Sequence, residues 1–453
     1  MSEPKGGLLM PRIIDLFAGL GGIRLGFQQA MDELGLKTEC VFSSEIKSYA
    51  IKAYKGFYGD EEIYGDITLV NPKQDIPDFD YLLAGFPCQP FSSAGNRNGF
   101  ADTRGTLFFE IERILQDKIN TNHPAKGFLL ENVEGLMSHD NGNTLNIIIT
   151  HLERLGYHVS CKLLDSRYFG LAQSRKRVYI VGSLDEDINL DNFERREAVL
   201  GDILQHGLPT ADTNFTRKLF ANYTTQDVIG KSIKDKRGGD NNIHSWDIDL
   251  KGETSSLERN LMSTLLRERR KKHWAEAIGI KWMDGMPLTE DQIRTFFNVP
   301  KLHEMLEHLT EMGYLVYEYP KQQVKGNDGI VKRIPDKSKD KGYNIVAGKL
   351  SFEFSKILDT RTIAPTLVAM DVSKLGVVDG NGLRRLTIRE CQRLCGYPDN
   401  YNLDMISESE AFDLLGNTVC VPVIKDISLR IGRSYLNNIK GGYSNEIICA
   451  RNI

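Results

Sequence analysis

The first 183 residues alternate short apolar segments with helix-like segments, and this rhythm limits the fold more than any other feature of the chain. The apolar segments have the Ile, Leu, Val and Phe content that is typical of buried strands; they are 13–17, 40–42, 80–84, 127–130 and 177–181. A helical pattern begins at Ile23, shortly after the first of them. Strands that alternate with helices predict an α/β domain around a mostly parallel sheet.

Polar or glycine-rich residues follow several of these segments, at the edge where open α/β sheets bind ligands. The glycine turn at 18–22 (Ala-Gly-Leu-Gly-Gly) precedes the first helix, so backbone N–H groups there can approach a ligand closely. Glu45 follows the second strand and suits ribose hydroxyls, although a helix-cap role also explains it. Asp66 suits an adenine amino group. Together the three positions favour a nucleoside-containing cofactor.

Cys88 lies between Pro87 and Gln89, just past the strand at 80–84. Free cysteine is usually a buried packing residue, and that alternative applies to any isolated thiol. Here the neighbours are turn-forming residues, which hold backbone in a loop at the ligand-binding edge of the sheet. We therefore interpret Cys88 as a presented nucleophile.

Three charged residues complete a candidate reaction centre. Glu131 ends the apolar strand at 127–130, where burial raises a carboxyl pKa and favours a proton donor. Arg175 and Arg177 are two positions apart and share one side of the start of a strand, where they can orient a carboxylate and a carbonyl oxygen. Alone, Glu131 could equally be a cap or a structural ion-pair partner, and the arginines could be surface residues.

The alternation breaks between about 185 and 375, which predicts an inserted domain. Residues 251–275 and 321–343 each carry seven Lys or Arg against three acids, a local charge of +4 in a chain of net charge −4. Helices at 289–297 and 301–312 precede a hairpin formed by 314–319 and 329–334. That order fits a winged-helix DNA reader over 287–334, or an unrelated packing of small elements. The expected domains are 1–184, 185–405 and 406–453.

Composition excludes several classes. No apolar run reaches the roughly 20 residues that span a bilayer, and the first residues lack the apolar core of a signal peptide. Seven scattered cysteines argue against a disulfide framework and for a reducing cytoplasm. Cys391 and Cys395 have no second pair or nearby histidine, so we expect no metal site.

Assembled, these motifs resemble the cytosine-C5 DNA methyltransferases of bacterial restriction–modification systems. The matching segments follow the family order over most of the chain: 15–22, Glu45, 65–67, 85–89, 105–109, 131–133, 173–177, 385–387 with 396–399, and 416–419. The family carries its variable target-recognition region between the motifs of Arg177 and Arg385, where the alternation breaks. The family often has Ser at the position of Thr418, and Ala94 leaves open how the gap in the duplex is filled.

The resemblance implies a Rossmann-like domain that uses S-adenosylmethionine to methylate C5 of a cytosine flipped out of double-stranded DNA. Cys88 is then the nucleophile at C6, Glu131 the group at N3 and Arg177 the group at O2, while Arg175 positions the loop and Glu131. The implied cofactor residues are Phe17, Ala18, Gly19, Leu20, Gly22, Glu45, Ile46, Asp66, Ile67, Pro87, Leu107, Asn417, Thr418 and Val419. The expected DNA contacts are Ser92, Arg104, Arg267, Arg269, Arg270, Lys271, Lys272 and Thr366.

We expect a cytoplasmic, nucleoid-associated monomer whose functional counterpart is a restriction endonuclease. Two alternatives remain at this point. The first is the same chemistry on tRNA, as in one eukaryotic branch with a smaller recognition region. The second is a DNA-binding regulator that kept the fold without activity, which the intact Cys88, Glu131 and Arg177 disfavour.

Overall fold

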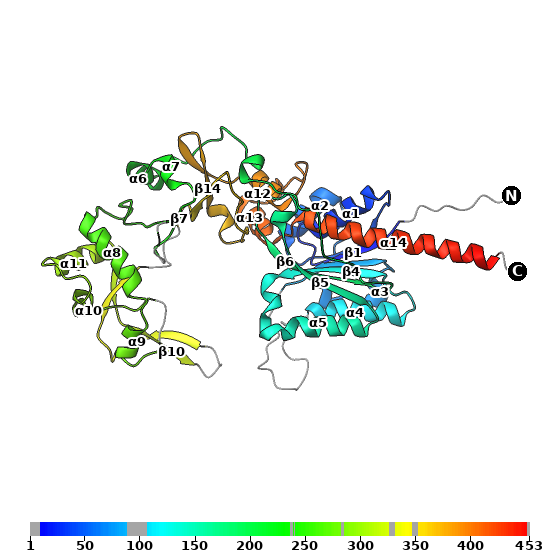
Figure 1. Cartoon of the computed structure of the whole chain (residues 1–453), viewed down its shortest axis with the longest axis horizontal. Coiled ribbons are helices and arrows are strands. Elements are labelled where there is room, and N and C mark those ends of the chain that lie inside the picture. Colours follow the sequence, from blue (N-terminus) through cyan, green and yellow to red (C-terminus); the bar gives the residue numbers. More distant parts are fainter. Residues whose placement is uncertain are drawn as a thin grey trace. The chain divides into compact units, whose positions relative to one another are not determined.

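The computed structural model describes residues 10–87, 107–235, 239, 241–281, 285–325, 331–346 and 352–450, with the backbone alone at 325, 331 and 439–450 (Figure 1). The chain forms two compact units. The main unit comprises Met1–Leu204, Thr360–Ser373 and Thr387–Ile453, and the inserted unit comprises Gln205–Asp359 and Lys374–Leu386. In the described residues no helix is both long and apolar enough to cross a bilayer.

The main unit contains a six-stranded sheet in the order β2-β1-β3-β4-β6-β5. Its elements are β1 (Arg12–Leu16), α1 (Gly22–Glu33), β2 (Glu39–Ser44), α2 (Ser48–Tyr58), α3 (Pro72–Asp75), β3 (Tyr81–Gly85), α4 (Leu107–Asn120), β4 (Gly127–Val133), α5 (Asn143–Arg154), β5 (His158–Asp165), β6 (Lys176–Ser183), α12 (Ile388–Cys395), α13 (Glu408–Asn417) and α14 (Val421–Ala450). Strands β2, β1, β3 and β4 are parallel, and β6 is antiparallel to both β4 and β5. The predicted mostly parallel α/β sheet is thus confirmed.

Two apolar layers cover the sheet, because successive strand residues face opposite sides. In β1, Ile14 and Leu16 pack with residues of α4 and α5. Ile13 faces the other way and packs with α1 and α14. This accounts for the near-continuous apolar runs in the sequence, since strands covered on both faces need no polar side.

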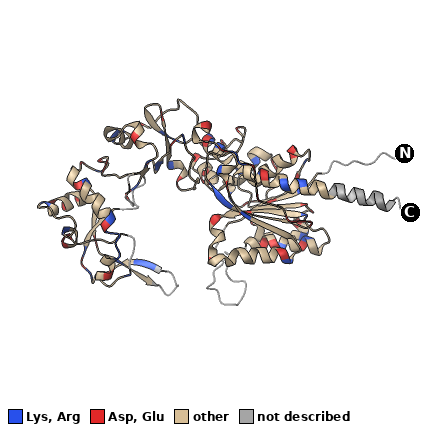
Figure 2. Cartoon of the chain, in the orientation of Figure 1, with Lys and Arg blue, Asp and Glu red and all other residues tan. Residues whose placement is uncertain are grey.

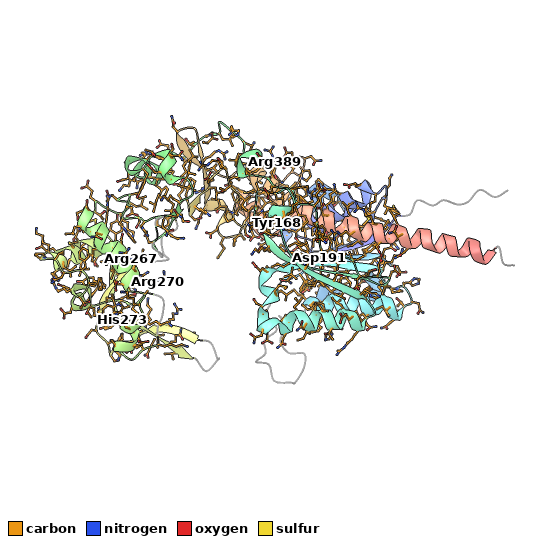
Figure 3. All side chains as sticks on the ribbon, in the orientation of Figure 1. Tyr168, Asp191, Arg267, Arg270, His273 and Arg389 are labelled. Atoms are coloured by element: carbon orange, nitrogen blue, oxygen red, sulfur yellow. The ribbon has the colours of Figure 1, made fainter. Side chains whose placement is uncertain are left out.

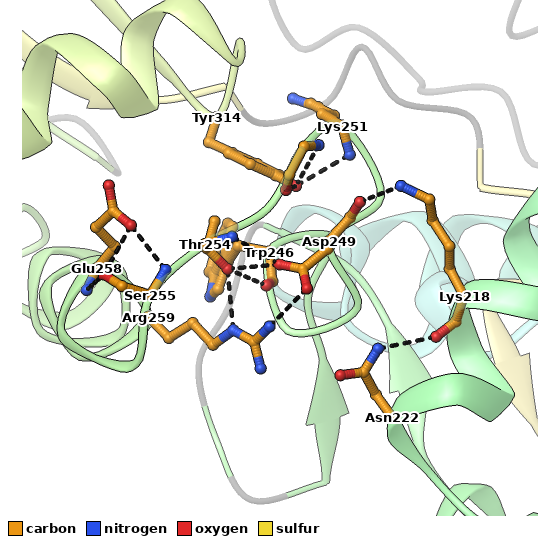
Figure 4. Close-up of polar contacts among 11 residues, drawn as sticks. Lys218, Asn222, Trp246, Asp249, Lys251, Thr254, Ser255, Glu258, Arg259 and Tyr314 are labelled. Carbon is orange, nitrogen blue, oxygen red and sulfur yellow. Dashed lines mark hydrogen bonds and ion pairs between the residues drawn. The ribbon is translucent and has the colours of Figure 1, made fainter.

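The inserted unit holds a five-stranded sheet, β15-β14-β13-β7-β8, and two two-stranded sheets. Its elements are α6 (Asn214–Asn222), α7 (Thr225–Val228), β7 (Ser232–Ile233), β8 (Asn242–Ile243), α8 (Ser256–Glu268), α9 (His273–Ala277), α10 (Glu290–Arg294), α11 (Leu302–Glu311), β9 (Leu315–Glu318), β10 (Lys321–Lys325), β11 (Val331–Pro335), β12 (Gly342–Ile345), β13 (Lys356–Ile357), β14 (Leu375–Asp379) and β15 (Gly382–Arg385). The loop before α8 is held by Asp249, which has a left-handed φ of 52°. Its carboxylate accepts hydrogen bonds from the N–H and hydroxyl of Thr254 and forms an ion pair with Arg259 (Figure 4).

The predicted hairpin of 314–319 with 329–334 is wrong in its pairing. Strand β9 pairs with β12, and the inner strands β10 and β11 pair with each other. The partner of β9 therefore begins at Gly342 and not at 329, a choice that strand propensity alone does not reveal.

The inserted unit is narrower than the predicted range 185–405. Residues 185–204, 360–373 and 387–405 belong to the main unit. There the Gln173 side chain accepts from the N–H of Leu367 (2.9 Å) and donates to the carbonyl of Leu394 (2.8 Å). These buried bonds hold both returning segments beside the start of β6.

Candidate active site

The three strand-end positions singled out from the sequence meet at one edge of the main sheet. The N–H of Ala18 donates to Ser44 O (3.0 Å), and the N–H of Gly19 donates to Glu45 Oε2 (2.8 Å). The N–H of Glu45 in turn donates to Tyr64 O (2.9 Å), which brings the Gly65–Asp66 turn alongside. The ends of β1 and β2 and the turn at 64–66 therefore form one cradle.

Backbone strain marks the floor of this cradle. Phe17 has a φ of 55°, a left-handed conformation that is costly for a bulky residue and is retained where function or packing requires it. Gly19 (φ 54°) has open space around it, since an added Cβ would meet nothing nearer than Phe17 O at 4.0 Å. Gly22 differs, because a Cβ there would lie 2.4 Å from the Tyr397 hydroxyl and 2.7 Å from Val419. Gly19 can admit a ligand, whereas Gly22 is needed for helix packing.

The remaining candidate cofactor residues surround the cradle with different exposures. Ile46 is 74% exposed although it is a large apolar residue. Asp66 uses Oδ1 to accept from the N–H and hydroxyl of Thr68, and its Oδ2 makes no hydrogen bond to a described residue. Ile67 is buried, Leu107 is half-buried and Pro87 is exposed. The exposed apolar side chain of Ile46 and the Oδ2 acceptor of Asp66 together fit an adenosine moiety.

A C-terminal segment is tied to the second strand end. Asp413 accepts from Lys47 Nζ (2.8 Å), from the Tyr49 hydroxyl (2.7 Å) and from Asn417 Nδ2 (3.1 Å). Thr418 is buried and shares a 2.5 Å hydrogen bond with Tyr397. Asp413 was not predicted from the sequence. The only feature that pointed to it is its position four residues, or one helical turn, before Asn417.

Glu131 and Arg177 form a buried ion pair, with Arg177 Nε 3.0 Å from Glu131 Oε1 and side-chain exposures of 14% and 11%. Burial raises the pKa of Glu131 above its ordinary range, and the guanidinium groups of Arg177 and Arg175 oppose that rise. A buried carboxyl with a raised pKa beside a cation can hold or share a proton at neutral pH. The sequence analysis placed both residues in the reaction centre but did not predict that they pair with each other.

Arg175 has a different part in the site. Its Nη1 donates to Leu367 O (2.8 Å) and its Nη2 donates to Gly416 O (3.2 Å), and the side chain is buried. Both bonds end on backbone carbonyls of segments far away in the sequence. Arg175 therefore joins the 364–369 and 416–419 segments to the start of β6, and it acts through them.

The strand end that leads to Cys88 lies next to Glu131. Gly85 pairs with Glu131 in the parallel register of β3 and β4, and a Cβ on Gly85 would lie 3.7 Å from Glu131 Oε2. Asn132 Nδ2 donates to Phe86 O (2.9 Å), which ties the two strand ends together. Sequence reasoning quoted Asn132 within a motif but gave it no role. Cys88 itself lies outside the described residues, as do Ser92 and Arg104.

The expected DNA contacts of the basic run divide into exposed and buried residues. Arg267, Lys271 and Lys272 are exposed and Arg270 is half-buried, at the end of α8 and in the turn after it (Figure 3). Arg269 is only 4% exposed, and its Nη1 donates to Asn344 Oδ1 (2.6 Å). The structure does not support Arg269 as a phosphate contact, because its guanidinium is committed to the interior of the inserted unit.

Thr366 also has an internal bond. Its hydroxyl donates to Ser174 O at 2.7 Å, and the residue is half-buried. Its hydroxyl proton is therefore used within the main unit, where it fixes the segment beside Arg175.

The fold and this site define an α/β methyltransferase domain with a separate inserted unit, and comparison with known proteins narrows the class. The sequence model of the family described as C-5 cytosine-specific DNA methylase matches residues 11–433. The Type II methyltransferase M.NlaIV of Neisseria lactamica is 53% identical over 427 residues, covering 93% of this chain and 98% of that protein. The Type II methyltransferase M.BanI of Aneurinibacillus aneurinilyticus is 39% identical, covering 95% and 97%.

Among solved structures, a putative DNA modification methyltransferase encoded within an E. coli prophage shares the fold. Its TM-score is 0.50 at 19% identity, over 93% of this chain and 99% of that one. The chain belongs to the C-5 cytosine-specific DNA methylase family and is a DNA cytosine-5-methyltransferase of the restriction–modification type.

Proposed function

We propose that the protein transfers a methyl group from S-adenosylmethionine to C5 of one cytosine within a specific double-stranded DNA sequence, with the base flipped into the site. The observation that carries this proposal is the buried Glu131–Arg177 pair beside the strand end that leads to Cys88. A duplex hides C5 and C6 of cytosine, so an enzyme that acts there must expose the base.

The cradle suits the proposed cofactor. Glu45, whose carboxylate is already oriented by backbone N–H groups, retains acceptor capacity for ribose hydroxyls. Ile46 offers an exposed apolar face to adenine, and Asp66 Oδ2 offers an acceptor to its amino group. When bound, S-adenosylmethionine supplies an electrophilic methyl group. Phe17, Ala18, Gly19 and Leu20, with Ile67, Pro87, Leu107 and Asn417 to Val419, complete the proposed binding set.

In the proposed reaction the Cys88 thiolate adds to C6 of the cytosine, and a carbon–sulfur bond forms. Glu131 shares its proton with N3 while Arg177 donates to O2, so the electron pair of the former double bond collects at C5. C5 would then take the methyl group as the bond between that methyl and the sulfonium sulfur breaks, with the bonding pair staying on the sulfur. The C5 proton passes to solvent, and the pair it leaves restores the C5–C6 double bond as the bond to Cys88 breaks. Glu131 recovers its proton in that last step.

The biological part of the proposal is protection of host DNA from a restriction endonuclease of matching specificity. Relatives named Type II methyltransferases support it. We also propose that the chain acts as a monomer, in the cytoplasm and on the nucleoid. For an enzyme of this kind, each half of a palindromic site can be methylated by a separate binding event.

The test compares wild type with Cys88→Ser in an expression host whose DNA is bisulfite-sequenced. Wild type is expected to give 5-methylcytosine at one sequence, and the variant none, while both bind S-adenosylmethionine in calorimetry. Cys161→Ser, at a half-buried thiol in the edge strand β5, is the matched control and should methylate as wild type does. Methylation by Cys88→Ser equal to wild type would overturn the nucleophile, and methylation of tRNA without methylation of the duplex would overturn the substrate.

A further inference from the structure

The inner hairpin of the inserted unit, β10 (Lys321–Lys325) with β11 (Val331–Pro335), is strongly cationic. Its two strands contain Lys321, Lys325, Lys332 and Arg333 and no acidic residue. Figure 2 shows Lys and Arg along this hairpin. A two-stranded ribbon fits the major groove of duplex DNA, which is about 12 Å wide.

The register gives the hairpin two unlike faces. Gln323 pairs directly with Arg333, and Lys321 lies on the same face, two residues from Gln323. The opposite face carries Val324 and Ile334, which are 38% and 42% exposed, together with Lys332. The first face therefore carries three of the four cations, with Val331 and Pro335 at its ends, and the other face is partly apolar.

The side chains of Gln323 and Arg333 are exposed and make no hydrogen bond or ion pair to any described residue. Lys321 differs, because its Nζ lies 3.0 Å from Glu318. An arginine with no acidic partner keeps its planar fork of donors available for a ligand. Arg binds the O6 and N7 edge of guanine in two hydrogen bonds, and Gln binds the N6 and N7 edge of adenine in the same way. The pair has the chemistry of base reading.

The neighbouring helix α11 is a poorer candidate. Its apolar side, with Leu302, Leu306 and Leu309, is buried in the unit. Its exposed positions include Glu304, Glu307 and Glu311. Three carboxylates on the outer side of a helix repel DNA phosphates. This charge distribution favours the hairpin over α11 as the element that reads bases.

The outer pair below the hairpin is anchored, and this limits how the hairpin can move. Asn344 in β12 accepts from Arg269 Nη1 and donates to Glu318 in β9 (2.9 Å). The Tyr317 and Tyr343 rings pack across the same pair, with centroids 4.9 Å apart. Rigid support of this kind is what a base-reading side chain requires to hold its position.

We propose that the β10–β11 hairpin enters the major groove and that Gln323 and Arg333 contact base edges of the target sequence. The exposed cations at the end of α8, Arg267 among them, contact phosphates beside it. This inference rests on the proposed function, since it names the element that selects the duplex.

The experiment uses the full-length enzyme and a library of duplexes with randomised positions around a cytosine, read by methylation-sensitive sequencing. Arg333→Ala and Gln323→Ala are expected to relax base preference at one or two positions each. The loss of discrimination there should be about 5- to 150-fold, the usual range for a two-bond base contact. Arg333→Lys keeps the charge but loses the fork, so it should relax the same position as Arg333→Ala.

Lys337→Ala is the matched control, because Lys337 is an exposed cation outside the two strands. It should lower methylation of all sequences alike and leave the preference profile intact. Profiles for both Arg333 variants and Gln323→Ala that match wild type at every position would overturn the hairpin proposal while leaving the proposed function standing. A wild-type enzyme that methylates no duplex in the library would overturn the proposed function itself.

Discussion

Replacing Asp15 by Asn should make the enzyme's stability less dependent on pH. Asp15 lies between the buried residues Ile14 and Leu16 of β1 and is itself 1% exposed. Burial raises its pKa from 3.8 to about 7, although the Arg24 cation and a 3.2 Å hydrogen bond from the Tyr54 hydroxyl oppose the rise. Asn has nearly the same shape and no charge, so the substitution removes the titration and little packing.

The sign and size follow from proton linkage. The folded chain holds the Asp15 proton more tightly than the unfolded chain, so this group lowers the free energy of unfolding as pH rises from about 4 to 7. At 1.36 kcal/mol per pH unit the whole loss is roughly 4 kcal/mol. Between pH 5 and pH 8 it amounts to roughly 2.5 kcal/mol, since part of the window lies below pH 5 and the slope vanishes above the folded pKa.

Urea unfolding of both proteins at pH 5, 6, 7 and 8, followed by circular dichroism, measures the effect. The free energy of unfolding of wild type minus that of Asp15→Asn should fall by roughly 2.5 kcal/mol from pH 5 to pH 8 and level off there. Trp246 and Trp274 belong to the inserted unit, so their fluorescence provides an internal reference. Asp60→Asn is the control, because an ion pair with Lys55 lowers the pKa of Asp60 below its ordinary value. Its titration therefore lies below this pH range, and the difference between wild type and Asp60→Asn should stay flat from pH 5 to pH 8. For Asp15→Asn, a difference that stays within about 0.5 kcal/mol across this range would refute the reasoning.

Two further predictions concern the centre of the site. Glu131→Gln should lower kcat/KM by roughly 10²–10⁴-fold, the usual range for an acid–base group. Cofactor affinity measured by calorimetry should not change. A loss of kcat/KM below tenfold would contradict the role of Glu131 as the acid–base group. Arg175→Met should lower the free energy of unfolding in urea by roughly 2–5 kcal/mol, because two buried carbonyls lose charged donors. Arg167→Met, at a half-buried guanidinium, is the control, and equal losses in the two variants would contradict the positioning role of Arg175.

Much of the main sheet was predictable because most of its strands are marked by sequence features within a few residues. Strands β1, β2, β3, β4 and β6 are all confirmed, since each is an apolar run that ends in glycine or polar residues. Strand β5 was missed. It lies at the sheet edge, and most of its residues are half-buried or exposed, so it lacks such a run.

The inserted unit was harder to predict because its stability depends on pairings between distant residues. Arg269 lies in a run of cations that appears solvated, yet its bond to Asn344 buries it. Strands β10 and β12 were not predicted from the sequence, so the two predicted strands, 314–319 and 329–334, were paired with each other. The site shows the same division: Glu131 and Arg177 were predictable from strand ends, whereas the role of Asp413 depends on the packing of α13 against the β2 edge.

Backbone hydrogen bonds hold together the segments by which the chain leaves and re-enters the main unit. Within the main unit, the N–H of Leu200 donates to Thr362 O (2.8 Å) and the N–H of Gly201 donates to Thr360 O (2.8 Å). These bonds hold the departing and returning segments together before and after residues 205–359. Arg175 then anchors the continuation of the returning segment through Leu367. Because every one of these bonds ends on a backbone atom of the main unit, the side chains of the inserted residues can change to suit another DNA sequence without moving Glu131 or the cofactor cradle.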